Sequence, residues 1–241
     1  MKKAIITCLL ITLASAAFAQ SRSVSILGDS YSTFEGYLQP DTNYIWYFQK
    51  AHLNQTDVTD VTQTWWHQFI TRNGYKLCQN NSLSGSTICN TGYNRQDVRN
   101  LSFIRRMDNL GNPDIILIFG GTNDSWAHSP EGDYKYSDWT RADLYNVRPA
   151  TAYMLDYILK RYPNVEVYFM LNSELDADFN ETAETICRHY NVPLLKLHDI
   201  AKQAGHPNKA GMTAIADQLT AFVKKEQKKE KKENEHIFIR S

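Results

Sequence analysis

The chain has 241 residues, enough for one domain with a sizeable hydrophobic core and long loops. Its 26 Lys and Arg residues balance its 26 Asp and Glu residues, so no net charge attracts it to nucleic acid or to an anionic membrane surface. Charge therefore argues against a nucleic-acid-binding protein, and the expected partner is a small molecule or another uncharged substrate.

The N-terminus has the pattern of a secretory signal peptide. Lys2 and Lys3 precede an apolar run over residues 4–16, and residues 17–19 have the Ala-x-Ala form of a cleavage site. The run is too short for a membrane-spanning helix, and no later run is long or apolar enough. We therefore expect residues 1–19 to be removed near Ala19 and the protein to be exported to the periplasm or the cell exterior.

The first half of the chain contains three predicted strands and one predicted helix. Residues 24–27 form a short apolar run that ends at a glycine, which is typical of a buried strand. Apolar side chains between 65 and 70 recur at helical spacing. A weaker strand follows over 76–80, and the run at 114–119 is the clearest buried strand of the chain.

The second half continues the alternation of helix and strand. A helix is predicted over 149–162 and a strand over 165–171. Apolar residues at helical spacing predict a further helix over 178–190, a strand follows at 194–197, and residues 212–223 carry one apolar stripe of a last helix.

Two helix ends have their own signals. Asp178 and Glu181 have the spacing of a capping box, which places a helix start near Asp178. Residues 224–235 are dense in Lys and Glu, and we expect the C-terminal segment 225–241 to form a solvated extension of the last helix or a frayed tail. The domain itself is predicted to span residues 20–224.

Strands joined by helical crossovers predict a parallel sheet that is covered by helices on both faces. Four polar blocks follow the strands or open a helix. They are Gly28-Asp29-Ser30, Ser84-Gly85-Ser86, Gly121-Thr122-Asn123-Asp124 and His206-Pro207-Asn208. Because ligands bind outside the carboxyl ends of parallel strands, we expect all four blocks to meet at one edge of the sheet.

The blocks contain the residue types that an esterase needs. Ser30 could attack an ester carbonyl if a base took its proton, and His206 could be that base. The Asn123 side chain and the Gly85 backbone N–H could donate hydrogen bonds to the oxyanion. Taken singly, each block is equally well explained as a turn, a helix cap or a polar loop. Together, in this order, they favour a serine hydrolase.

This order of blocks resembles the SGNH branch of the GDSL esterase/lipase superfamily, especially its secreted bacterial members, over nearly all of the chain after residue 19. The resemblance implies a three-layer α/β/α sandwich, flavodoxin-like, with a five-stranded parallel sheet. It implies Ser30 as nucleophile and His206 as base. The oxyanion hole would be the Ser30 N–H, the Gly85 N–H and the Asn123 side chain. The implied activity is hydrolysis of carboxylic esters without a metal or an organic cofactor.

Two positions depart from the family pattern. Tyr31 replaces the leucine of the name-giving motif, a harmless change because tyrosine can also fill an apolar site. The family usually has an aspartate three residues before the histidine to orient the imidazole, and here that position is Gln203. Either a backbone carbonyl orients His206, or another carboxylate does so. Glu174, at the end of the fourth strand, is the candidate for that carboxylate, and Asp199 is a weaker one.

Aromatic residues are concentrated in two segments that follow polar blocks. They are Tyr37, Tyr44, Trp46, Tyr47, Phe48 and Trp65 in the first segment, and Trp126, Tyr134, Tyr136, Trp139 and Tyr145 in the second. Such rings suit contact with sugars, although long loops also use aromatics to pack against themselves. A long-chain lipase would favour aliphatic residues at its entrance.

These observations favour release of a small acyl group, such as acetyl, from a glycan or a similar polar carrier. The alternatives are a lysophospholipase or thioesterase, and a non-catalytic carbohydrate-binding relative. Cys78, Cys89 and Cys187 are expected to be buried small side chains, with a Cys78–Cys89 disulfide as the alternative. No His, Cys and Asp cluster has the spacing of metal ligands, so no metal site is predicted.

Overall fold

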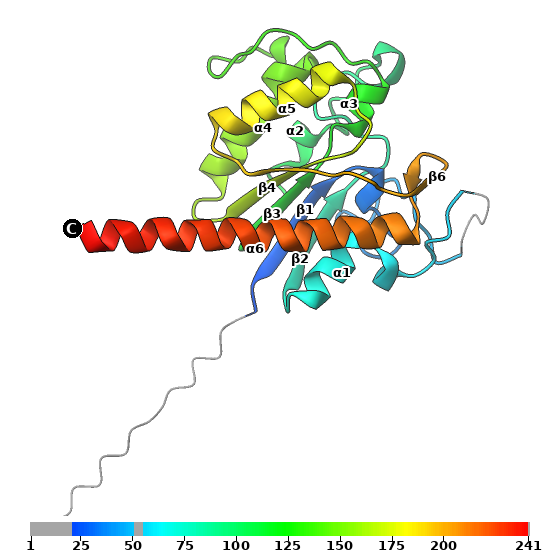
Figure 1. Ribbon diagram of the computed structural model, residues 1–241. Helices are drawn as coiled ribbons and strands as arrows, with labels where there is room; N and C mark the ends of the chain where they lie inside the picture. Colours follow the sequence, from blue (N-terminus) through cyan, green and yellow to red (C-terminus); the bar gives the residue numbers. More distant parts are fainter. Residues whose placement is uncertain (1–20, 51–54, 241) are drawn as a thin grey trace, which may run out of the picture.

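The computed structural model describes residues 21–50 and 55–240, so the predicted signal peptide lies outside the described residues. Five parallel strands form one sheet between two layers of helices (Figure 1). The order across the sheet is β2-β1-β3-β4-β5, which confirms the predicted three-layer, flavodoxin-like sandwich. The strands are β1 (Ser23–Gly28), β2 (Lys76–Ser82), β3 (Ile115–Phe119), β4 (Glu166–Leu171) and β5 (Leu194–Lys196).

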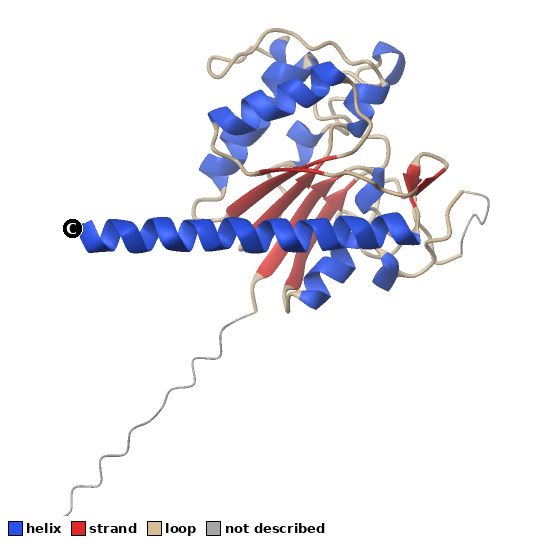
Figure 2. Cartoon of the chain, viewed as in Figure 1, coloured by secondary structure: helices blue, strands red, loops and turns tan. Residues whose placement is uncertain are grey.

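Strand β3 shows why helices cover both faces of the sheet. All five of its side chains are buried, and alternate residues point to opposite faces. Ile115, Leu117 and Phe119 pack in the core under α1 and α6, whereas Ile116 and Ile118 pack in the core under α2, α4 and α5 (Figure 2). The helices are α1 (Trp65–Arg72), α2 (Phe103–Arg106), α4 (Val147–Arg161), α5 (Ala177–His189) and α6 (Lys209–Arg240).

The order of the strands reverses at β1, because β2 lies on one side of β1 and β3 lies on the other side. In folds of this kind, ligands bind in a crevice at such a reversal, outside the carboxyl ends of the strands on either side of it. Several short elements gather at this edge. They are the 3₁₀ helix η1 (Ser30–Ser32), α3 (Thr122–Trp126), and the hairpin of β6 (Lys202–Gln203) and β7 (His206–Pro207). The remaining 3₁₀ helices are η2 (Val61–Gln63), η3 (Tyr93–Arg95) and η4 (Asp143–Tyr145).

The start of α5 differs from the sequence prediction. The helix begins at Ala177 with Asp176 as its N-cap residue, and no side chain caps it, so the predicted capping box of Asp178 and Glu181 is wrong. The backbone N–H of Asp176 instead donates to Ser125 Oγ at 3.0 Å. This tertiary contact provides an acceptor for the backbone N–H at the helix start, which lies two residues earlier than the local sequence indicates.

The C-terminal helix α6 is 32 residues long and continues through the Lys- and Glu-rich segment to Arg240. Its apolar stripe, which includes Met212, Ile215 and Leu219, packs on the sheet. None of the described helices is both long and apolar enough to cross a membrane. Cys78 is half-buried, Cys89 and Cys187 are buried, and all three thiols are free.

Candidate active site

The turn that follows β1 places Ser30 at the crevice. A Cβ atom at Gly28 would lie 2.5 Å from Ser82 Oγ and 2.6 Å from Ser32 Oγ, so only glycine lets the chain pass here. Asp29 caps η1, because its Oδ1 accepts a hydrogen bond from the Tyr31 N–H at 3.0 Å. The Ser30 side chain is therefore held on a rigid turn, with only 5% of the residue exposed.

The β6–β7 hairpin brings His206 to Ser30. His206 Nε2 lies 2.9 Å from Ser30 Oγ, and His206 Nδ1 lies 3.0 Å from the carbonyl oxygen of Ala204. A carbonyl only accepts hydrogen bonds, so Nδ1 carries the proton and Nε2 is left to accept the Ser30 hydroxyl proton. The structure thus joins the two residues in the arrangement that a nucleophile and its base require.

The environment keeps His206 neutral. Burial lowers its pKa to about 4, and the positive charge of Lys202 acts in the same direction. The hydrogen bond to the Ala204 carbonyl opposes both effects. An imidazole that is neutral at neutral pH can accept a proton, which is what a general base needs.

Asn123 lies on α3, directly after β3. Hydrogen bonds to its amide oxygen and from its amide nitrogen fix the orientation of its side chain. Its Nδ2 donates to the carbonyl of Ser86 at 3.0 Å, and its Oδ1 accepts from the hydroxyl of Tyr93 at 2.9 Å. An amide nitrogen carries two hydrogens, so one N–H of Asn123 remains for a substrate oxygen. Tyr93 was not identified from the sequence, because it lies in an irregular loop without periodicity.

Gly85 lies one residue before Ser86, in an exposed part of the same loop. Its φ of 80° is in the left-handed region that favours glycine, although a Cβ atom there would meet no other atom within 4 Å. Backbone conformation rather than lack of space therefore requires glycine. The Asn123 side chain contacts the carbonyl of Ser86, the residue after Gly85.

A buried arginine connects the strands under the site. Arg106 donates hydrogen bonds to the carbonyl of Gly28 at 3.2 Å, to Ser86 Oγ at 2.8 Å and to the carbonyls of Asn81 and Leu101. Burial lowers its pKa to about 9, while the neighbouring charge of Asp29 opposes that shift. Arg106 thereby ties the end of β1 to the loop that carries Gly85.

A buried aspartate fixes the other side of that loop. The Asp124 carboxylate accepts hydrogen bonds from the backbone N–H groups of Ile88 at 2.7 Å and Cys89 at 3.1 Å. Burial raises its pKa to about 6, and these hydrogen bonds oppose the shift. Because Asp124 follows Asn123 on α3, it holds the loop against the helix that carries Asn123.

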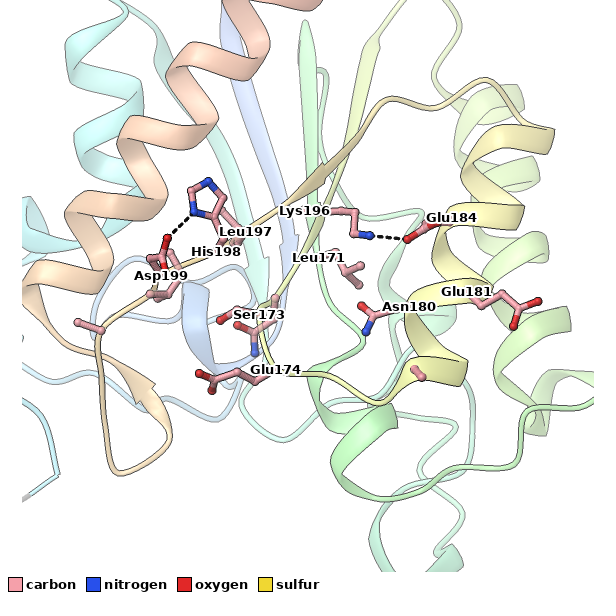
Figure 3. A pocket seen from close by; sticks show the side chains of 14 residues that line it. Leu171, Ser173, Glu174, Asn180, Glu181, Glu184, Lys196, Leu197, His198 and Asp199 are labelled. Carbon is pink, nitrogen blue, oxygen red and sulfur yellow. Dashed lines mark hydrogen bonds and ion pairs between the residues drawn. The ribbon is translucent and has the colours of Figure 1, made fainter.

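The structure does not bring Glu174 to His206. Its carboxylate accepts a hydrogen bond from Lys202 Nζ at 3.0 Å, and its side chain is 77% exposed. Figure 3 shows Glu174 at a pocket of about 860 Å³, where Asp199 pairs with His198 at 2.8 Å. Neither carboxylate therefore contacts the imidazole.

The hairpin explains why a carbonyl takes the place of a carboxylate. Strands β4 and β5 are neighbours, as the argument for Glu174 assumed. However, Ala204 and Gly205 both have positive φ values, of 47° and 74°, and this tight turn folds the Ala204 carbonyl back to His206 Nδ1. Of the two alternatives from the sequence, the structure has the backbone carbonyl.

The aromatic segments divide between the site and the core. Tyr44, Tyr93 and Trp126 are 66%, 40% and 40% exposed. Tyr93 contacts Asn123, the Trp126 ring lies 6.2 Å from that of His206, and the Tyr44 carbonyl accepts from the Ser84 N–H at 2.9 Å. The second segment mostly contributes elsewhere, since Tyr134, Tyr136 and Trp139 pack against the core under α4 and α5. Their assignment to the substrate site has no support in the structure.

Within the described part of the chain, no group of three or more His, Cys, Asp or Glu side chains is placed to hold a metal ion. At the edge of the sheet, the structure brings together Ser30, His206 and the hydrogen-bond donors around them. This set fits nucleophilic acyl transfer.

The chain is similar to proteins of known structure. A protein from Bacteroides ovatus assigned as a GDSL-like lipase is 62% identical in sequence, with a TM-score of 0.84, over 85% of this chain and 99% of that one. A second, from Bacteroides uniformis, is 50% identical with a TM-score of 0.82, over 84% and 95% of the two chains. Est24, a carbohydrate acetylesterase from Sinorhizobium meliloti, is 15% identical with a TM-score of 0.57, over 84% and 98%, and this likeness concerns the fold alone.

A comparison with curated proteins gave no match. The profile of the GDSL-like Lipase/Acylhydrolase family matches residues 22–223, which include all four polar blocks and the whole sheet. The chain therefore belongs to the GDSL-like lipase/acylhydrolase family.

Proposed function

We propose that the protein is a serine-dependent carboxylic ester hydrolase that releases a small acyl group, in the first place acetyl, from a glycan or a similar polar carrier. The observation that carries the proposal is the distance of 2.9 Å between Ser30 Oγ and His206 Nε2. Family membership supports ester hydrolysis in general, and the substrate class is the finer part of the proposal.

The reaction follows from these positions. Ser30 Oγ attacks the ester carbonyl carbon while its proton passes to His206 Nε2. The oxyanion accepts hydrogen bonds from Asn123 Nδ2 and from the backbone N–H groups of Ser30 and Gly85. His206 then gives the proton to the leaving alkoxide, which departs as the alcohol and leaves an acyl-Ser30 ester. Water, deprotonated by His206, attacks this ester and releases the acid, and the proton returns to Ser30.

The polar carrier is inferred from the exposed rings at the site. Among the described residues, the exposed large hydrophobic side chains are Leu101 and four aromatic ones, of which Tyr93 contacts Asn123 and Trp126 lies beside His206. Each of these rings has an apolar face and a polar tip, which suits the faces and hydroxyl groups of a sugar. A lysophospholipase would need an aliphatic surface for its long acyl chain.

Export of the mature protein is a further part of the proposal. It is supported by the basic and apolar pattern at the N-terminus, with the Ala-x-Ala motif that ends at Ala19. An exported esterase would meet acetylated polysaccharides outside the cytoplasm.

The test uses the mature protein, residues 20–241. Acetate release from acetylated polysaccharides is measured beside hydrolysis of p-nitrophenyl esters of increasing acyl length, with Ser30→Ala as control. We expect acetate release, the highest kcat/KM for the shortest acyl groups, and no turnover by Ser30→Ala. Preference for long acyl chains would indicate the lysophospholipase or thioesterase alternative. Sugar binding without turnover would indicate a non-catalytic relative.

A further inference from the structure

One face of the His206 imidazole is covered by the indole of Trp46. The two rings are nearly parallel, with centroids 3.6 Å apart and an interplanar angle of 9°. The Tyr31 and Trp126 rings approach the imidazole at tilted or perpendicular angles, with centroids 5.2 Å and 6.2 Å away. Trp46 is therefore the ring in full face contact with the imidazole.

The backbone of Trp46 is connected to the nucleophile as well. Its N–H donates to Thr33 Oγ1 at 2.9 Å, and the Thr33 hydroxyl donates to the carbonyl of Ser30 at 2.9 Å. With the contact between His206 Nε2 and Ser30 Oγ, the four residues form a closed ring of interactions. The position of the indole is thus fixed relative to Ser30 and not only relative to its own loop.

Other contacts fix the backbone of the histidine but not its ring. The Tyr31 hydroxyl donates to the carbonyl of Gly205 at 2.6 Å, and the Tyr47 hydroxyl donates to the carbonyl of Pro207 at 2.8 Å. The ring itself has two hydrogen bonds, one between Nδ1 and the carbonyl of Ala204 and one between Nε2 and Ser30 Oγ. Contacts at the two ring nitrogens leave the ring free to turn about the line that joins these atoms, and a parallel indole restricts that turn.

We propose that Trp46 is a positioning residue for the base, and that its stacking on His206 provides the orientation that an aspartate three residues before the histidine provides in relatives. The position of that aspartate is occupied by Gln203. The two contacts then have different roles: the hydrogen bond to the Ala204 carbonyl sets the tautomer of His206, and Trp46 fixes the orientation of the ring plane. The inference rests on the proposed function, since it concerns the base of that reaction.

The stacking can be tested through the pKa of His206, because this pKa depends on the groups that surround the imidazole. Lys202, on β6, is the charged side chain whose field acts on His206, and it lowers the pKa in the same direction as burial. The hydroxyls of Tyr31 and Tyr47 stay neutral, because burial raises the pKa of both above the ordinary value. Removal of the indole would admit water to one imidazole face, so the His206 pKa should then rise toward 6.5.

The experiment compares Trp46→Phe, Trp46→Leu and Tyr37→Leu on one acetyl ester. Tyr37 belongs to the same loop, is 40% exposed and packs on Phe34 and Trp66, so it controls for the loss of an aromatic ring from this segment. We expect Trp46→Leu to lower kcat by about 10²-fold with little change in KM, because a misplaced base costs about that much. Trp46→Phe, which keeps a flat ring, should remain within about threefold of the wild type, and Tyr37→Leu should be unchanged.

The pH profile separates positioning from a structural role. In Trp46→Leu the acid limb of kcat/KM should move up toward pH 6.5, whereas in Trp46→Phe it should stay low. Equal losses in both Trp46 variants, or a loss in Trp46→Leu with an unmoved acid limb, would overturn the inference. If Ser30→Ala keeps its turnover, the proposed function itself fails. If Ser30→Ala is inactive and Trp46→Leu is fully active, only the role of Trp46 fails.

Discussion

The hydroxyl of Tyr93 donates a hydrogen bond to Oδ1 of Asn123, over 2.9 Å. This contact fixes which end of the Asn123 amide faces the Ser86 carbonyl and which N–H remains for substrate. Tyr93 belongs to η3 and Asn123 to α3, so two loops that follow different strands build one hydrogen-bond donor. The exposed Tyr93 ring and the Asn123 amide are thereby connected by a hydrogen bond.

Tyr93→Phe should lower kcat by about five- to tenfold and leave KM nearly unchanged, because a neutral hydrogen bond contributes about 1 kcal/mol. Steady-state kinetics on an acetyl ester measure the effect. The matched control is the double variant with Asn123→Ala, which should be no slower than Asn123→Ala alone, since Tyr93 is expected to act through Asn123. Additive losses would show that Tyr93 acts on the substrate directly.

Asn123→Ala should lower kcat by about 10²–10³-fold, because the donor acts mainly on the charge that develops in the transition state. KM should change little. The control is circular dichroism of the folded variant, since Asn123 also donates to the Ser86 carbonyl. If only KM changed, the amide would position ground-state substrate and would not belong to an oxyanion hole.

The acid limb of kcat/KM should lie near pH 4, because burial lowers the His206 pKa to about that value and the base must be neutral. The same shift affects stability. The folded state binds fewer protons than the unfolded state between pH 4 and 6.5, so the contribution of His206 to the free energy of unfolding decreases as the pH falls through this window. A rate profile from pH 3.5 to 9 measures the limb, and a limb near pH 6.5 would contradict the prediction.

Glu174→Gln should change kcat less than about twofold, because the Glu174 carboxylate is exposed to solvent where it pairs with Lys202 and does not contact the imidazole. His206→Ala serves as the inactive control in the same assay. A substantial loss in Glu174→Gln, with an unchanged fold, would mean that the hairpin rearranges in the working enzyme to bring this carboxylate to the imidazole.

Arg106→Leu should lower the free energy of unfolding by about 3 kcal/mol or more, because it leaves several buried carbonyls without their charged donor. Denaturation in urea measures the loss. Arg106→Lys should fall between the wild type and Arg106→Leu, since an ammonium group cannot reproduce the planar fork of donors. Equal stability of all three proteins would show that the carbonyls find other partners.

The sheet and the contact between Ser30 and His206 could be predicted because their signals are local in sequence. Runs such as residues 114–119 must be buried strands, and parallel strands bring their carboxyl ends to one edge. The strand predicted over 76–80 ends two residues too early, because β2 continues to Ser82. The side chains of Asn80 and Asn81 are satisfied there by tertiary hydrogen bonds to the carbonyls of Ser32 and Arg106. The order of the blocks then placed a serine, an amide and a histidine together.

The rest depended on contacts between distant segments. Helices α2 and α3 are four and five residues long, too short to show a periodicity. The partner of His206 Nδ1 is a backbone carbonyl, which every residue has, so no side chain could identify it. Likewise, nothing local separates Trp46, which stacks on the base, from Trp139, which packs on Tyr153.

Helix α6 places its C-terminal end at a distance from the candidate active site. The helix begins three residues after His206, runs along the sheet and ends far from the hairpin that contains β6 (Figure 1). At 1.5 Å per residue its 32 residues extend over about 48 Å. A bead, electrode or fusion partner attached near Arg240 would therefore stand well away from the substrate entrance. Immobilisation through that end should leave access for bulky polymers, whereas attachment near the β6–β7 hairpin should obstruct it.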